Sequence, residues 1–333
     1  MKKSIVAALA ASFILSIAGT ALAFPVEFNG DFRLQGRVIN DKAGGSQGTD
    51  GSWFQLRSRV NFTGAVDEDT TFFGRFSVRN NFGGAQTGTG TNNGAFDQYG
   101  IKGKAGEWKY SLGRQAVSLG QGTIVSTGSD AVGVDNKFDG AILSTKSGDF
   151  DINVIGGKIN NGNGYSGSRE VYGFDASTKV DKVTVGAAYA IGRIDGSVGD
   201  TKFWGINTSA PVGNSINLST EYVKSNADTD NSAYFVAGTY SWKKDSFTVQ
   251  YNNVKKYAVD PFNSGIGSVA YPFMGDGLFD WDNGENRDYK GFTYVYTHSI
   301  NKSLSFHAIY LDLEATGYTG SDKELGAGLV WSF

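Results

Sequence analysis

The most regular feature of the sequence is an alternation of apolar and polar residues with a period of two. In residues 26–39 the apolar positions are Val26, Phe28, Phe32, Leu34 and Val38. Charged or amide side chains lie at most positions between them, and residues 53–66 repeat the pattern. Because successive side chains of a strand point to opposite faces, this period predicts strands with one apolar and one polar face rather than amphipathic helices.

The same rule predicts sixteen strands, most of them near the length of a membrane-spanning strand. They cover residues 26–39, 53–66, 70–80, 95–104, 107–116, 138–146, 149–159, 170–180, 183–192, 201–210, 215–224, 232–242, 246–255, 289–300, 304–314 and 323–333. Short turns such as 66–69 and 147–148 alternate along the chain with long loops such as 40–52 and 117–137. An even strand number, with tight turns at one rim and long loops at the other, is typical of a bacterial outer-membrane barrel.

The remaining fold class to weigh is a soluble β-sandwich. After the first 23 residues no stretch is long and apolar enough for a membrane helix, which leaves a sandwich or a membrane barrel. Aromatic residues gather near the ends of the apolar faces, among them Trp108, Tyr172, Trp204, Tyr240 and Trp331. Rings at the level of the lipid headgroups form the girdles of membrane barrels, so the pattern favours an all-β, transmembrane, antiparallel up-and-down barrel.

The N-terminus predicts export. Lys2 and Lys3 precede an apolar run from Ile5 to Ala18, and the small-residue motif at 21–23 fits a cleavage site. We therefore expect residues 1–23 to be a cleaved signal peptide and residues 24–333 to form a single barrel domain. The predicted location is the outer membrane of a diderm bacterium, reached through the periplasm.

Composition narrows the function classes. The chain has no Cys, so a disulfide framework and a thiolate metal site are excluded. The formal charge is -3, and loss of Lys2 and Lys3 with the leader makes it -5. An acidic chain of this kind is not expected to bind nucleic acid.

Two segments resemble those of a known family. The last strand places Leu325, Ala327, Leu329, Trp331 and Phe333 on one face and ends in Phe. This terminus is similar to the signal that the barrel-assembly machinery recognises, carried here by Trp331 and Phe333. Residues 110–115, a loop of roughly 20 residues and then residues 136–141 resemble the fifth strand, inward-folded third loop and sixth strand of Gram-negative general porins. The resemblance implies a third loop folded into the lumen, a homotrimer, and contacts with the lipid bilayer and lipopolysaccharide.

Inward-facing arginines are the main candidate for function. By parity with the apolar residues, arginines of three neighbouring strands point into the barrel; they are Arg33, Arg37, Arg57, Arg59, Arg75 and Arg79. Counting from the turns puts Arg33, Arg59 and Arg75 near one level. Guanidinium groups keep their charge at ordinary pH, so they need water or acidic partners. Asp130 and Asp135 on the third loop, together with Asp31 and Glu27, are the candidate partners, and the resemblance adds Arg114 to the constriction loop.

These features predict a passive diffusion channel for small hydrophilic solutes and ions. A basic wall facing an acidic loop sets a transverse field across the water, and six arginines against two loop acids predict a mild anion preference. The alternative is a substrate-selective channel for anions or sugars. It draws on the long loop 256–288, where aromatic and acidic residues are interleaved; that loop could equally pack on its own barrel or on a neighbouring subunit.

An enzymatic function is not expected. The only histidines are His298, which shares parity with residues that face lipid, and His307, which faces the lumen. No serine or acid at a convincing spacing completes a catalytic triad. We expect no cofactor, and the acidic cluster Asp276, Asp280, Asp282 and Glu285 fits no calcium-loop pattern, so no metal site is predicted.

Overall fold

The structure is a computed structural model of the full chain. It describes residues 25–41, 51–82, 93–127, 137–160, 169–194, 200–255, 257–259, 288–315 and 321–333. The predicted signal peptide, the loop acids Asp130 and Asp135, and most of loop 256–288 lie outside the described residues.

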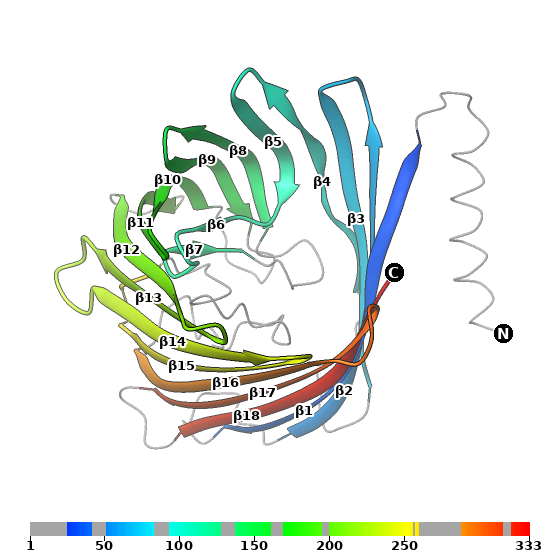
Figure 1. The fold of residues 1–333 in the computed structure, drawn as a ribbon, viewed down its shortest axis with the longest axis vertical. Helices are drawn as coiled ribbons and strands as arrows, with labels where there is room; N and C mark the ends of the chain where they lie inside the picture. Colours follow the sequence, from blue (N-terminus) through cyan, green and yellow to red (C-terminus); the bar gives the residue numbers. More distant parts are fainter. Residues whose placement is uncertain are drawn as a thin grey trace.

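Sixteen strands form a closed antiparallel barrel (Figure 1). The strands of the barrel are β1 (Val26–Asp41), β2 (Gly51–Ala65), β3 (Thr70–Phe82), β4 (Asn93–Ala105), β5 (Trp108–Gln115), β8 (Lys137–Ser147), β9 (Phe150–Asn160), β10 (Arg169–Val180), β11 (Val183–Ile194), β12 (Thr201–Val212), β13 (Ile216–Ser225), β14 (Ser232–Trp242), β15 (Asp245–Val254), β16 (Tyr289–Ser299), β17 (Leu304–Ala315) and β18 (Ser321–Ser332). Two further strands, β6 (Ser118–Leu119) and β7 (Val125–Ser126), form a small separate hairpin. The predicted fold class is confirmed, and every predicted barrel strand is present.

The first and last strands close the ring. β1 pairs antiparallel with β18, from Asp31 opposite Ser332 to Asp41 opposite Asp322. The backbone N–H of Gly30 donates to the carbonyl of Phe333, and the ring of Phe333 lies 5.7 Å from that of Phe32. Closure leaves no unpaired edge, which is the condition for a sheet to cross a membrane. In the parts of the chain that the structure describes, no helix is long and apolar enough to cross a membrane.

The two faces of the sheet differ as the alternation predicts. On β10, Tyr172 and Phe174 are 50% and 48% exposed. Arg169 and Val171, on the opposite face of the same strand, are buried. Large exposed apolar side chains occur on most strands of the barrel, and the predicted girdle residues Trp108, Trp204 and Trp331 are among them. An apolar surface of this extent faces acyl chains rather than water.

The inner face is not uniformly polar. On β14, β16 and β17 most buried, inward positions are apolar, and they include Phe235, Val295, Ile309, Leu311 and Leu313. On β15 and β16 the polar residues Gln250, Asn252 and Thr293 are buried among them. On β1 to β4 the equivalent positions hold arginine, glutamine and aspartate. The interior therefore has a basic side and a side of mixed apolar and uncharged polar residues, a difference that the alternation of residues does not predict.

A β-bulge interrupts the alternation in β4. Arg75 pairs with Gln98 and Phe76 pairs with Phe96, so Asp97 is an extra residue between two registers. A bulge lets two neighbouring residues face the same side of the sheet. Asp97 is completely buried on the arginine-bearing side for this reason.

Candidate functional site

The arginine wall consists of Arg33, Arg37, Arg57, Arg59, Arg75 and Arg79 on β1, β2 and β3. Arg33 and Arg57 are 2% exposed, Arg37 is 5% exposed and Arg75 is 6% exposed. Arg33 lies directly opposite Arg57 in the register, and Arg57 lies opposite Arg79, so three like charges occupy one cross-strand row. Such a row requires carboxylates or water close by, because an arginine does not neutralise by losing its proton.

Asp31 supplies part of this compensation. Its two carboxylate oxygens accept from Arg57 at 2.7 Å and from the Nε atom of Arg59 at 2.8 Å. Asp31 lies two residues before Arg33 on β1 and directly opposite Arg59 on β2. The single carboxylate of Asp31 thus holds two arginines of β2 in fixed positions. Asp31 is one of the partners predicted from the sequence.

Two further carboxylates were not identified as partners from the sequence. Asp97 accepts two hydrogen bonds from Arg75, at 2.7 and 2.8 Å, and a third from the hydroxyl of Ser77 at 2.7 Å. Glu324 on β18 accepts from Arg37 at 2.5 Å. Asp97 is difficult to assign by parity because the bulge breaks the period of two in β4. The Arg37–Glu324 pair joins residues far apart in the sequence, so no local pattern indicates it.

Arg114 lies elsewhere than expected. It is in β5, not in a loop, and its register partners are Tyr99 on β4 and Asp139 on β8. Tyr99 is 49% exposed on the outward face, and Arg114 lies over its ring at 5.7 Å. Arg114 also makes two hydrogen bonds of 2.6 Å to Asp139. Its assignment to the constriction is therefore corrected, because this ion pair belongs to the outer surface.

The start of the 117–137 connection, which contains the β6–β7 hairpin, packs on the inner side of strands β8 to β13 (Figure 1). Backbone N–H groups of Gln121 and Thr123 donate to the two carboxylate oxygens of Glu221 on β13, at 3.1 and 3.0 Å. The N–H of Gly120 donates to Asp175 on β10 at 3.2 Å. The carboxylates of Asp175 and Glu221 therefore hold the β6–β7 hairpin by its backbone.

Apolar side chains anchor the same hairpin. Val117, Leu119, Ile124 and Val125 are at most 5% exposed, and they pack with inward side chains of β8 to β13 such as Phe203. The wall makes room for them with glycine: a Cβ on Gly173 would lie 2.6 Å from Leu119. The structure describes this connection only as far as Thr127, so the narrowing of the lumen by the whole third loop stays a prediction.

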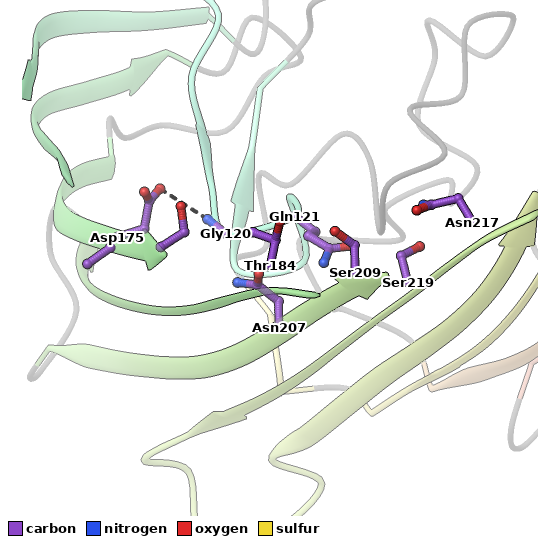
Figure 2. A pocket seen from close by; sticks show the side chains of 10 residues that line it. Gly120, Gln121, Asp175, Thr184, Asn207, Ser209, Asn217 and Ser219 are labelled. Atoms are coloured by element: carbon purple, nitrogen blue, oxygen red, sulfur yellow. Dashed lines mark hydrogen bonds between the residues drawn. The ribbon is translucent and has the colours of Figure 1, made fainter. Parts of the chain in front are cut away.

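A polar niche opens beside the tip of the hairpin (Figure 2). Its volume is about 370 Å³. Its lining is mostly uncharged and hydrogen-bonding, and it consists of Gly120, Gln121, Asp175, Ala176, Ser177, Thr184, Asn207, Ser209, Asn217 and Ser219. Side chains of four strands converge on it, with Asp175 as the single acid.

The two histidines occupy the positions that parity predicts. His298 lies on the face of Tyr296, and both contact Asp245, at 2.7 and 2.6 Å. His307 lies between two hydroxyls: its Nε2 atom is 2.7 Å from Ser305 and its Nδ1 atom is 3.2 Å from Thr297. The Ser305–His307 contact was not foreseen. In a serine hydrolase the Nδ1 atom faces a carboxylate, whereas here Thr297 lies in that position.

No site for a metal is evident in the described ranges, where no three His, Cys, Asp or Glu side chains gather to hold one.

Known proteins with the same barrel place this geometry in context. A family model described as Gram-negative porin matches residues 6–318. Among solved structures, a loop-deletion mutant of OmpT, an outer membrane protein of Vibrio cholerae, is similar with a TM-score of 0.60 and 15% identity. A triple mutant of the porin of Rhodopseudomonas blastica is similar with a TM-score of 0.56 and 13% identity. In both comparisons the match covers 93% of this chain and 100% of the other. No match was found among curated protein sequences.

The family match spans most of the chain, and the structural similarity independently shows the same fold. A closed sixteen-stranded barrel with an apolar exterior is consistent with both. The location of such a barrel is the outer membrane, and its general role is that of a channel rather than an enzyme. The chain belongs to the Gram-negative porin family.

Proposed function

We propose that this porin is a passive diffusion channel for small hydrophilic solutes and ions, filtered by the arginine wall. The rim with the long connections faces the outside of the cell, and the rim with the tight turns faces the periplasm. The observation that carries the proposal is the position of the arginine wall: in the strand order it lies across the ring from β12 and β13, where the hairpin packs. Solutes would pass between the two.

The charge balance between these two sides sets the expected selectivity. Within the described residues, Asp31, Asp97 and Glu324 accept from arginines of the wall, so three carboxylates lie beside six guanidinium groups. With Asp130 and Asp135 of the third loop, the expected partners, the arginines still outnumber these acids by six to five. Charges at a narrow aqueous constriction bias the ions that enter. A mild preference for anions follows, despite the negative net charge of the chain.

Reversal potentials in a salt gradient test this assignment. The double variant Arg33→Ala, Arg59→Ala should shift the potential toward cation preference, while Arg57 still pairs with Asp31. The matched control is Lys182→Ala, Lys302→Ala, which removes the same charge from exposed turns at the periplasmic rim. An unchanged ion preference in the arginine variant, or an equal shift in the control, would refute the role of the wall.

The polar niche favours a second candidate function, a channel with a preference for uncharged polyhydroxylated solutes. Hydroxyl and amide side chains can both donate and accept, so a niche lined by Ser177, Asn207 and Ser209 suits a sugar better than an ion. Saturable blockade of the single-channel current by one class of sugar, lost in Asn207→Ala, would favour this function. Conductance that falls linearly with sugar concentration would favour the general pore.

The proposed assembly is a homotrimer that buries the outer wall of β1 to β3. Within their described residues, the outward positions of these strands carry no charged side chain. They expose large apolar groups, among them Phe28, Phe32, Leu34 and Phe54, at 39–55%. Phe54→Arg should shift the mass of the detergent-solubilised complex toward a single chain, whereas the matched change on the outer face of β12, Ile206→Arg, should not.

Export and assembly complete the proposal. Residues 1–23 would be removed, giving Phe24 as the mature N-terminus, which N-terminal sequencing of the exported protein tests. Trp331 and Phe333 would be read by the barrel-assembly machinery, and lipopolysaccharide would surround the mature barrel. Phe333→Ala should lower the yield of assembled barrel in the outer membrane more than it lowers refolding of the purified chain in detergent.

A further inference from the structure

A second niche opens in the lumen at the rim with the tight turns, and it is called here the lysine niche. Its volume is about 450 Å³. Three cations line it together with three hydroxyl side chains: Lys102, Lys104, Lys109, Thr71, Ser111 and Ser144. These residues belong to β3, β4, β5 and β8, which are neighbours in the ring (Figure 1). The lysine niche shares no lining residue with the polar niche beside the hairpin, so the two are separate.

The strand register places the three lysines on the inner face of the barrel. Thr71 lies four residues from Arg75 on β3, so the two side chains point to the same side, which is the lumen. Lys102 lies directly opposite Thr71 on one side and opposite Ser111 on the other. Lys104 and Lys109 follow two residues nearer the turn on the same face. The lysines therefore face the water of the pore and not the lipid.

The lysine niche lies between the arginine wall and the rim with the tight turns. A strand tilted by about 45° rises roughly 2.3 Å per residue along the membrane normal, so Thr71 lies about 9 Å from the level of Arg75. The direction is toward the turn at residues 66–69. An anion that has passed the arginine wall on its way to the periplasm next meets the three lysines.

The lysines lie close enough together to repel one another. Lys104 is directly opposite Lys109 in the β4–β5 hairpin, and Cβ atoms in such pairs are about 4.5–5.5 Å apart. Lys102 is two residues from Lys104 on the same strand, or about 7 Å. Like charges in directly opposite positions destabilise a sheet. All three side chains are exposed, and within the described ranges none of them forms an ion pair with a carboxylate.

Two acids also line the lysine niche, Glu68 and Asp69 in the turn between β2 and β3. Neither forms an ion pair with another described residue, so they leave the lysines without a direct counter-charge. The lining thus has three cations against two acids, with the cations along two strands and the acids at the edge. An oxyanion bound between the ammonium groups would relieve their repulsion.

The chemistry of the lining fits a phosphoryl group attached to a small polar solute. An ammonium group has three donors and a full charge, and it is a common partner of phosphate oxygens. Hydroxyl side chains such as Thr71 and Ser144 both donate and accept, which suits the hydroxyls of a sugar. A volume of about 450 Å³ is within the usual range for sites that hold a small organic molecule.

We propose that the lysine niche binds the phosphoryl group of small phosphorylated solutes that pass through the pore. The ammonium groups of Lys102, Lys104 and Lys109 contact the phosphoryl oxygens, and the hydroxyls of Thr71 and Ser144 contact the rest of the solute. This inference deepens the proposed function and rests on it for the path of the solute, because it names a class of anion and a second place where that anion is held.

Equilibrium binding to the refolded mature barrel in detergent tests the proposal. The probes are glucose 6-phosphate, inorganic phosphate and glucose, each titrated by calorimetry at one fixed ionic strength, because exposed charges are screened by salt. Glucose 6-phosphate carries both parts of the proposed ligand, and the other two probes carry one part each.

Three variants separate the charge of the niche from other effects. The niche variant is Lys102→Gln, Lys104→Gln, Lys109→Gln. The matched control removes three cations from exposed turns at the same rim, outside the niche: Lys182→Gln, Lys243→Gln, Lys302→Gln. The charge-retaining variant replaces the same three lysines by arginine.

An exposed ion pair contributes up to about fivefold to an affinity, so the niche variant should bind glucose 6-phosphate on the order of 10- to 100-fold more weakly. The matched control and the charge-retaining variant should bind like the wild type. Glu68→Gln should act in the opposite direction and tighten binding, because it removes a negative charge from the edge of the niche. Unchanged binding by the niche variant, or an equal loss in the matched control, overturns the proposal.

The three probes identify what the niche recognises. Lysine-dependent binding of both glucose 6-phosphate and inorganic phosphate supports the proposal, and tighter binding of glucose 6-phosphate shows that the hydroxyls of the lining contact the sugar. Equal affinities for the two show that the phosphoryl group alone is held. Binding of glucose as tight as that of glucose 6-phosphate overturns the proposal, since the site would then recognise a sugar and not a phosphoryl group.

Reversal potentials and conductance separate this inference from the proposed function. The double variant Arg33→Ala, Arg59→Ala should lose anion preference yet still bind glucose 6-phosphate, whereas the niche variant should still form open channels. An unchanged ion preference in the arginine variant refutes the filter at the wall but not the lysine niche. If the wild type gives no current steps, the pore is contradicted, and calorimetry on the same barrel still decides whether the lysines bind the phosphoryl group.

Discussion

The attachment of the β6–β7 hairpin to the barrel wall can be divided into a polar and an apolar part. Glu221 accepts two backbone N–H bonds from the hairpin. Glu221→Gln keeps one acceptor oxygen, so about one charge-assisted hydrogen bond, roughly 1.5–3 kcal/mol, is lost. Val117, Leu119, Ile124 and Val125 are buried, and burial of each contributes about 1.5–3 kcal/mol, or roughly 6–12 kcal/mol together. The apolar part is the larger.

This comparison predicts different outcomes for the two kinds of variant. In Glu221→Gln the hairpin should stay docked, and the single-channel conductance step should match the wild type. In Leu119→Ala, Ile124→Ala, each substitution costs about 2–5 kcal/mol, which removes most of the apolar anchor. The hairpin should then leave the wall for part of the time, giving noisier open channels with altered steps.

Single-channel recording in a planar bilayer is the assay, with Ile206→Ala, Leu218→Ala as the control. These two side chains are of the same types on neighbouring strands, but they are 64% and 48% exposed on the outer face. The reasoning fails if Glu221→Gln alone reproduces the noise of the double variant, or if the control does so.

Three further predictions concern single residues. Asp97→Asn leaves Arg75 buried without a full counter-charge, so the free energy of unfolding should fall by up to about 3–5 kcal/mol, the range typical of a broken buried pair. The denaturant midpoint should fall accordingly, and the pore should become more anion-preferring; an unchanged midpoint would contradict the pairing. In Gly120→Ala the new Cβ would lie on a left-handed backbone (φ 62°) and would also collide with Glu221. In the control, Gly148→Ala, the backbone is similar (φ 59°) but the Cβ would lie in open space. Only Gly120→Ala should disturb the open-channel current, and equal effects of the two would show that backbone strain alone is responsible. The backbone N–H of Asp69 donates to the Asp67 carboxylate, and this bond, followed by those from Thr70, holds the pKa of Asp67 below its usual range. The ionised Asp67 side chain therefore stabilises the folded barrel at pH values above its unfolded-state pKa. This stabilisation is lost as the pH falls through the folded-state pKa. The stability difference between wild type and Asp67→Ala should therefore shrink in acid, and a difference that grows would refute this sign.

The strands could be predicted from sequence because each follows from a local rule. A period of two needs only neighbouring residues, and a membrane outside the barrel makes the apolar face complete. The period of two is interrupted at Asp97, where one extra residue in β4 places two neighbouring side chains on the inner face. It was also overridden at Arg114, where the resemblance of residues 110–115 to a porin segment suggested a constriction residue. Parity with Trp108 and Leu112 indicates the outward face that the structure shows.

The anchoring of the hairpin could not be predicted in the same way. Gly120 and Asp175 are 55 residues apart, and Gln121 and Glu221 are 100 residues apart. Both contacts depend on the curvature of the closed sheet, which brings β10 and β13, three and six places from β5 in the strand order, within reach of the hairpin. The burial of apolar side chains such as Ile309 and Leu311 on the inner face of β17 is a similar case, because alternation assigns residues to a face but does not say what will cover that face.

The most direct test of the central claim is conductance of the purified, refolded mature chain in a planar lipid bilayer. A barrel that encloses a continuous path of water beside the arginine wall should give stepwise insertions with ohmic current and a reversal potential on the anion side. A chain that inserts into the bilayer as a folded barrel but gives no current steps would contradict the account.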